Sequence, residues 1–172
     1  MKFRFAALAG VLFVSGIAVG YAAQKTAPSL YRDKGNQEAA QALLKLATEQ
    51  ADGGSWELIA IGRVHYLGGA KAEGQAIFDD VLAHKPEESD LFRIARVYQE
   101  AGDWPQAKAL FDRYMATKPD DAGEIAMIGS YYMLHGDRAM AETLFDRSFR
   151  EDADFWANVA VAGSYLGVKP QE

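Results

Sequence analysis

Hydrophobic positions along the chain recur at helical spacing in pairs of short segments separated by turn residues. Residues 88–121 show the pattern most clearly, with one set at Leu91, Ile94, Ala95 and Tyr98 and a second at Ala107, Leu110, Phe111 and Tyr114. Gly102 and Asp103 interrupt the spacing between the two sets, and Pro119 follows the second. Glycine favours the turn, aspartate caps a following helix, and proline cannot continue one. The pattern predicts a helix-turn-helix unit.

This unit is repeated. The tetrapeptide that begins at Leu110 returns at Leu144, a spacing of 34 residues, and Gly102-Asp103 returns as Gly136-Asp137 at the same spacing. A helical unit of this length cannot bury its own apolar face, so such units stack on their neighbours. The repetition therefore favours a stacked array with an extended binding surface over an enzyme with a single pocket.

The residues shared by the units carry a family resemblance. In 88–121 they are Leu91, Ala95, Tyr98, Ala107, Phe111 and Pro119; in 55–87 they are Leu58, Gly62, His65, Gly74, Phe78 and Pro86; in 122–155 they are Ile125, Gly129, Tyr132, Ala141 and Phe145. This set resembles the tetratricopeptide repeat. The resemblance implies an all-α, right-handed α-solenoid over residues 24–172. Its predicted parts are a half-unit at 29–52, repeats at 55–87, 88–121 and 122–155, and a capping helix at 156–167.

The N-terminus has a different character. Lys2 and Arg4 precede an uncharged, mostly apolar run over residues 5–23 that ends in small residues. Residues 1–23 are thus predicted to be a signal peptide cleaved after Ala22 or an uncleaved membrane anchor, since the run approaches the roughly 20 apolar residues that span a bilayer. Both alternatives place the repeat domain in the periplasm, and the second adds an inner-membrane tether.

The composition of the chain limits the classes of partner that we expect. The formal net charge is −6, and removal of residues 1–22 would make the chain more acidic. Such a surface repels nucleic acid and anionic lipid headgroups, so neither is an expected partner. The chain has no cysteine, which excludes a lipid-anchored lipoprotein and a disulfide framework.

No catalytic motif is present. The sequence lacks the metalloprotease, serine hydrolase and Walker patterns, and its three histidines are scattered. His65 occupies a position that is tyrosine in the next two units and is predicted to be a partly packed core residue, while His135 before the Gly136 turn is predicted to be solvated. Acid pairs such as Asp79-Asp80 lack calcium-loop spacing. We therefore predict no enzymatic activity, no metal and no cofactor.

The resemblance also implies which residues bind. In tetratricopeptide arrays the first helices of successive units line a concave face, which here would be aromatic and apolar at its ends and basic in its middle. The residues taken from this face as candidates are Trp56, Arg63, Tyr66, Phe92, Arg93, Arg96, Gln99, Met127 and Met133. Arginine pairs with carboxylates, so the expected partner is an acidic or amphipathic protein segment. In the alternative interpretation, the three arginines pair with acids on neighbouring helices.

The C-terminal helix offers a second candidate surface. Residues 155–166 contain six large apolar or aromatic side chains, including Val161 and Tyr165, and no charged residue. Repeat arrays usually end with a helix whose outer face is polar. An oligomeric or partner contact is therefore predicted here, the alternative being a wholly buried cap.

Two functions fit these features. The first is a non-catalytic periplasmic scaffold or adaptor that assists assembly or stability of an envelope complex. The second is a permanent accessory structural subunit of an inner-membrane complex, anchored by its N-terminal helix. Retention of residues 1–22 on the purified protein would favour the second.

Overall fold

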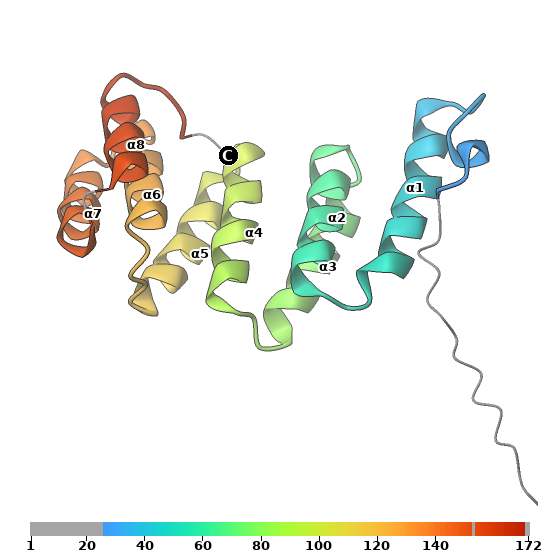
Figure 1. Ribbon diagram of the computed structural model, residues 1–172, viewed down its shortest axis with the longest axis horizontal. Coiled ribbons are helices and arrows are strands. Elements are labelled where there is room, and N and C mark those ends of the chain that lie inside the picture. The colour runs from blue at the N-terminus through green and yellow to red at the C-terminus, as the bar shows by residue number, and fades with distance from the viewer. Residues whose placement is uncertain (1–25, 153, 171–172) are drawn as a thin grey trace, which may run out of the picture. The chain divides into compact units, whose positions relative to one another are not determined.

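The computed structural model describes residues 26–152 and 154–170, and all of their regular structure is helical. A 3₁₀ turn at Pro28–Leu30 precedes eight α-helices in the described chain (Figure 1). These are α1 (Asn36–Ala51), α2 (Ser55–Leu67), α3 (Lys71–Ala83), α4 (Glu88–Glu100), α5 (Trp104–Ala116), α6 (Ala122–Leu134), α7 (Arg138–Glu151) and α8 (Phe155–Tyr165).

The chain divides into two compact units, residues 1–42 and 43–172, and the boundary falls within α1. In the part formed by residues 1–42 the structure describes residues 26–42, which form the 3₁₀ turn and the start of α1. The predicted signal peptide or anchor at 1–23 lies outside the described residues. No helix among the described residues is long and apolar enough to cross a membrane. The handedness of the array and the predicted domain boundaries stay predictions.

Residues 43–172 contain three helix pairs, which are the three repeat units: α2 with α3, α4 with α5, and α6 with α7. Helix α8 packs on α6. The helices of each pair run antiparallel and are joined by tight turns (Figure 1). Gly102 and Gly136 adopt φ angles of +79° and +86° in two of these turns, a conformation that glycine reaches without steric cost. The predicted all-α architecture of paired helices is confirmed.

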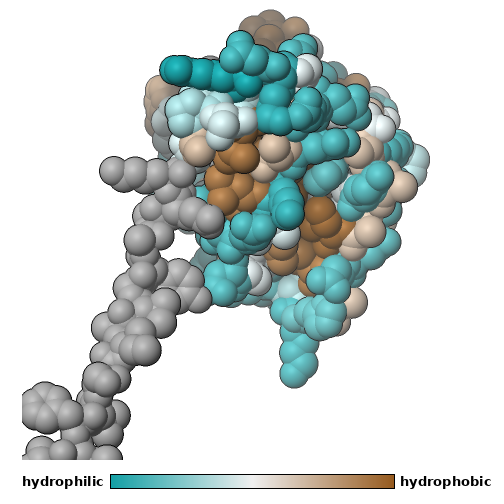
Figure 2. All heavy atoms as spheres, turned by 90° about the vertical axis from the view of Figure 1, so that its right-hand side faces the viewer, coloured by the Kyte–Doolittle hydropathy of each residue, from teal (hydrophilic) through white to brown (hydrophobic). Residues whose placement is uncertain are grey.

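The core is built from aromatic rings at the recurrent positions. Phe78, Phe111 and Phe145, one from each second helix, are fully or almost fully buried. The Phe111 ring stacks on Tyr131 of α6 with centroids 5.5 Å apart, so it connects its own unit to the next. Elsewhere the covering is incomplete, and Figure 2 shows hydrophobic residues between hydrophilic ones on the face turned to the viewer.

The cap expected at Asp103 is replaced by a contact between units. Asp103 stands at the N-cap of α5, but its side chain makes no capping hydrogen bond. Its Oδ2 instead accepts hydrogen bonds from Lys71 Nζ at 2.7 Å and from the Tyr66 hydroxyl at 2.6 Å. These two donors, Lys71 foremost, hold the pKa of the Asp103 carboxyl below its usual value. The expectation of a side-chain cap was wrong because the preceding unit supplies stronger donors.

His135 is exposed, as predicted, but its ring also contacts two neighbouring helices. Its ring stacks on Trp104 with centroids 4.1 Å apart and planes 6° from parallel. Its Nε2 lies 2.9 Å from Gln99 Oε1, so the neutral ring donates this hydrogen bond to α4. Burial, and after it the charge of Lys169, lower the pKa of His135 below 6.5.

This lowered pKa gives a pH prediction. The folded chain holds the His135 proton less tightly than the unfolded chain, so protonation favours unfolding. The stabilisation is complete above the unfolded pKa near 6.5 and is lost as the pH falls through the lower folded value. We expect the difference in unfolding free energy between the wild type and His135→Phe to shrink from pH 7.5 to pH 5. Urea titrations of both proteins measure it, and a constant difference would contradict the prediction.

Candidate protein-binding site

A hollow of about 230 Å³ lies between α2 and α4, the first helices of two successive units. Its lining residues are Trp56, Ile59, Ala60, Arg63, Arg93, Arg96, Val97 and Glu100. Arg93 and Arg96 are three residues apart on α4, a spacing that places both side chains on the same side of the helix. Trp56, at the start of α2, is 64% exposed and forms an aromatic wall. We call this feature the arginine hollow.

Arg63 is paired within the hollow. Its Nε donates a hydrogen bond to Glu100 Oε2 at 2.7 Å, and its Nη2 donates to Glu100 Oε1. The side chains are 43% and 30% exposed, so solvent screens the pair and its contribution to stability is at most about 1 kcal/mol. For this arginine, the alternative interpretation of pairing with an acid on a neighbouring helix is confirmed.

Arg93 and Arg96 form no ion pair with any acid in the described chain. The guanidinium of Arg93 lies over the Trp56 ring, 5.4 Å from its centroid, and its Nη1 donates to Ser89 Oγ at 3.2 Å. Arg96 lies over the Phe92 ring at 5.7 Å. Its Nε atom is buried and has no hydrogen-bond partner. Both cations are thus held by aromatic rings, and neither is neutralised by direct contact.

One carboxyl group from the next unit contributes to the electrostatic field at these arginines. Glu124 of α6 is half-buried and accepts a hydrogen bond from the Tyr114 hydroxyl. Burial is the largest effect on Glu124 and raises its pKa, while Arg93 and Arg96 act in the opposite direction. Glu100 and Glu124 therefore offset part of the positive charge, and substitution of either by glutamine should make the hollow more basic.

The structure brings four predicted binding residues together in the hollow, Trp56, Arg63, Arg93 and Arg96. Three others are buried: Tyr66 and Phe92 are each 4% exposed and Gln99 is 8% exposed. The Tyr66 hydroxyl is bound to Asp103, the Phe92 ring packs on Phe111 and Tyr114, and Gln99 is bound to His135. Their predicted role as contact residues is corrected, since Tyr66 and Gln99 connect successive units and Phe92 packs within its own unit.

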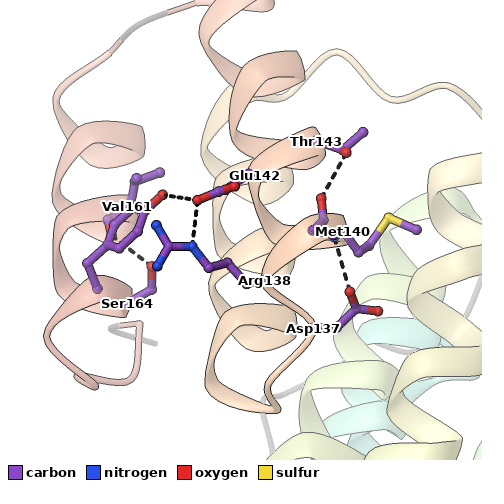
Figure 3. A network of polar contacts seen from close by, with 9 residues as sticks. Asp137, Arg138, Met140, Glu142, Thr143, Val161 and Ser164 are labelled. Atoms are coloured by element: carbon purple, nitrogen blue, oxygen red, sulfur yellow. Dashed lines mark hydrogen bonds and ion pairs between the residues drawn. The ribbon is translucent and has the colours of Figure 1, made fainter.

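The remaining candidates lie toward the C-terminus. Met127, Met133 and Val161 are all partly buried against the core, and Met127 also lines a second hollow beside α8. Tyr165 is about half exposed, and its hydroxyl donates to Glu142 Oε1 at 3.1 Å. Glu142 also accepts from Arg138 Nε at 2.8 Å, a contact that Figure 3 shows. Val161 and Tyr165 thus help to hold α8 against the rest of the domain, in addition to any contact that they make with a partner.

Sequence reasoning missed Glu124 as part of the site. It placed Ser89 and Glu100 on the predicted concave face but did not take them as binding residues. Arg63 and Glu100 both belong to the predicted concave positions of adjacent units, so opposite charges on one face were a usable signal. Ser89 lies one turn before Arg93, which is a helical contact distance. Glu124 gave no comparable signal, because its position depends on how α6 packs beside α4. No group of three potential metal ligands occurs among the described residues.

Comparison with known proteins agrees with this geometry. The family model described as tetratricopeptide repeat matches residues 69–128, from the turn before α3 to the middle of α6. Comparison with curated proteins found no match, and comparison with solved structures found none. The family found is typically non-catalytic, and no enzyme family was found. Residues 69–128 are thus similar to the tetratricopeptide repeat, and this similarity implies a scaffold for protein–protein interaction.

Proposed function

We propose that this protein is an exported, non-catalytic adaptor that holds an acidic or amphipathic segment of a protein partner in the periplasm. In this role it assists assembly or stability of an envelope complex. The observation that carries the proposal is the arginine hollow, where Arg93 and Arg96 lack acidic partners in the described chain and lie beside the exposed ring of Trp56.

The hollow suits a carboxylate next to an apolar side chain. Arginine offers several donors in a rigid fork, and hydrogen bonds between two charged groups are stronger than neutral ones. Arg93 is already held by Ser89 and Trp56, and Arg96 by Phe92. Binding of a partner would therefore cost less side-chain entropy, because these two arginines are already ordered. The neighbouring apolar side chain would pack on Trp56, which supplies a large contact area.

Charge reversal tests the site. We expect Arg93→Glu/Arg96→Glu to weaken capture of the partner by about 100-fold or more, because two charge-assisted contacts become repulsive. The measurement is affinity capture from detergent-solubilised envelopes with quantitative mass spectrometry. The wild type should also release the partner as salt rises, since screening weakens these contacts.

A matched control separates the site from net charge. Arg113→Glu/Arg150→Glu changes the charge by the same amount at two exposed positions on α5 and α7. It should retain the proteins that the Arg93/Arg96 variant loses. Equal capture by the wild type and both variants would refute the arginine hollow as the binding site.

The export part of the proposal rests on residues 1–23, where two cations precede an apolar run. Because the length of that run approaches the roughly 20 apolar residues that span a bilayer, the anchored subunit is the alternative function. Intact-mass measurement on protein purified from its native envelope distinguishes the two. A chain starting at Ala23 supports the exported adaptor, and a chain that keeps the N-terminal run supports the anchored subunit.

A further inference from the structure

Helix α8 presents an apolar surface that no other described residue covers. Residues 155–166 contain no charged side chain. Trp156 is 63% exposed, Val159 46% and Leu166 80%. Apolar patches of this kind on a soluble domain mark interaction sites. This surface is separate from the arginine hollow, and the inference below is independent of the proposed function.

The surface is hollowed as well as apolar. A cavity of about 510 Å³ lies between α6, α8 and the residues that follow α8. Its walls include Met127, Trp156, Val159, Gly163 and Val168. Gly163 leaves open space, because the nearest atom to a Cβ built there is 3.7 Å away on Val168. The hollow can therefore receive side chains from outside.

Helix α8 is held firmly in place. Ser130 Oγ of α6 donates a hydrogen bond to the Ala160 carbonyl oxygen at 3.0 Å. At the start of α8, the Asp154 side chain accepts from the Ala157 backbone N–H at 2.6 Å. On the α7 side, the Tyr165 hydroxyl donates a hydrogen bond to Glu142 Oε1 at 3.1 Å. The apolar surface is thus a preorganised face of a fixed helix, which lowers the entropic cost of docking.

The distribution of charge identifies the occupant. Asp154 lies at the N-terminal end of α8, Lys169 lies beyond its C-terminal end, and the face between them is uncharged. Two such helices packed antiparallel would bring each Asp154 to the end that carries the other Lys169, and their helix dipoles would oppose each other favourably. An uncharged centre can also face itself without repulsion. We infer that α8 of one copy packs antiparallel on α8 of a second copy, forming a two-fold symmetric dimer.

The solution mass of the full chain tests the inference. We expect a mass of two chains in sedimentation equilibrium at micromolar concentration. Val159→Asp should convert it to one chain, because it places two like charges near the two-fold axis. Val64 of α2 is the matched control, since it is a valine on another helix with nearly the same exposure, 47%. Val64→Asp should keep the dimer, and circular dichroism should show native helicity for both variants.

Cross-linking provides a second measurement that does not disrupt the surface. The chain has no cysteine, so Val159→Cys and Val64→Cys each introduce a single thiol. Under mild oxidation Val159→Cys should form a covalent dimer at least about tenfold faster than Val64→Cys, because the axis passes close to Val159. A single-chain mass at all concentrations, a dimer that survives Val159→Asp, or equal cross-linking of the two thiols would each overturn the inference. A monomer whose capture of another protein depends on Val159 would also overturn it and assign the face to that protein.

Discussion

Replacing Phe111 by alanine is expected to lower the free energy of unfolding by about 3–5 kcal/mol. The side chain is fully buried. Its ring contacts Tyr131 of α6, Phe92 of α4 and Trp104 of α5, with centroids 5.5, 6.1 and 6.4 Å away. The substitution removes the burial of an aromatic ring and leaves a cavity between two units. Because the neighbouring rings belong to three helices, they cannot all move to fill it.

Urea denaturation followed by circular dichroism measures this loss. Phe149→Ala serves as the control, because Phe149 is also on a second helix but is 38% exposed, and its loss should stay within about 1 kcal/mol. If the two substitutions cost the same, Phe111 would not be the ring that joins the second and third units.

The buried positions of the second unit could be predicted from the sequence. Leu91, Ile94, Ala95 and Tyr98 were placed on one face by their spacing alone, and all four are buried. This prediction succeeds because helical periodicity determines which side of a helix faces its neighbour, whatever the neighbour is. Because the pattern is repeated, the sequence also predicted that the two helices of each unit pack as a pair.

The binding surface was only partly predictable. The repeat pattern predicts which residues lie on the concave side of a helix. It does not predict whether their side chains contact the neighbouring helix or stay accessible to a partner. Tyr66 is long enough to reach Asp103 of the following unit, which takes it out of the surface. Arg93 starts from a comparable position, yet it meets Ser89 and Trp56 and keeps its charge available. The difference lies in which partner groups are within reach of each side chain, and the repeat pattern does not specify these groups.

Close approach of helices is a further property that the sequence indicated only coarsely. Small residues recur at one position of each second helix, and they are Gly74, Ala107 and Ala141. Ala107 and Ala141 are fully buried, so the later units accommodate a methyl group there. In the first unit, a Cβ on Gly74 would lie 2.6 Å from Tyr66 N and 2.7 Å from Gly62 O. The sequence indicated a small residue, and the structure shows that only glycine fits at this crossing.

Substitution of Gly74 by alanine is therefore expected to destabilise the protein by about 3 kcal/mol or more, although alanine normally favours a helix interior by roughly 0.5–1 kcal/mol. The obstructing atoms belong to the backbone of α2, so the helices must separate. This separation would loosen the packing of Phe78 at the same crossing, where the ring centroids of Phe78 and Tyr66 are 5.7 Å apart. Thermal and urea unfolding of the variant measure the effect.

Gly163→Ala distinguishes this steric cause from a general effect of the substitution. Gly163 also lies within a helix, but a Cβ there would meet no atom closer than 3.7 Å. Its replacement should leave the unfolding free energy unchanged or raise it by up to about 1 kcal/mol, since alanine restricts the unfolded chain without strain in the folded one. Opposite signs for the two variants would show that the distance between α2 and α3, rather than helix propensity, requires glycine at position 74. A Gly74→Ala protein as stable as the wild type would mean that α2 and α3 are further apart than described.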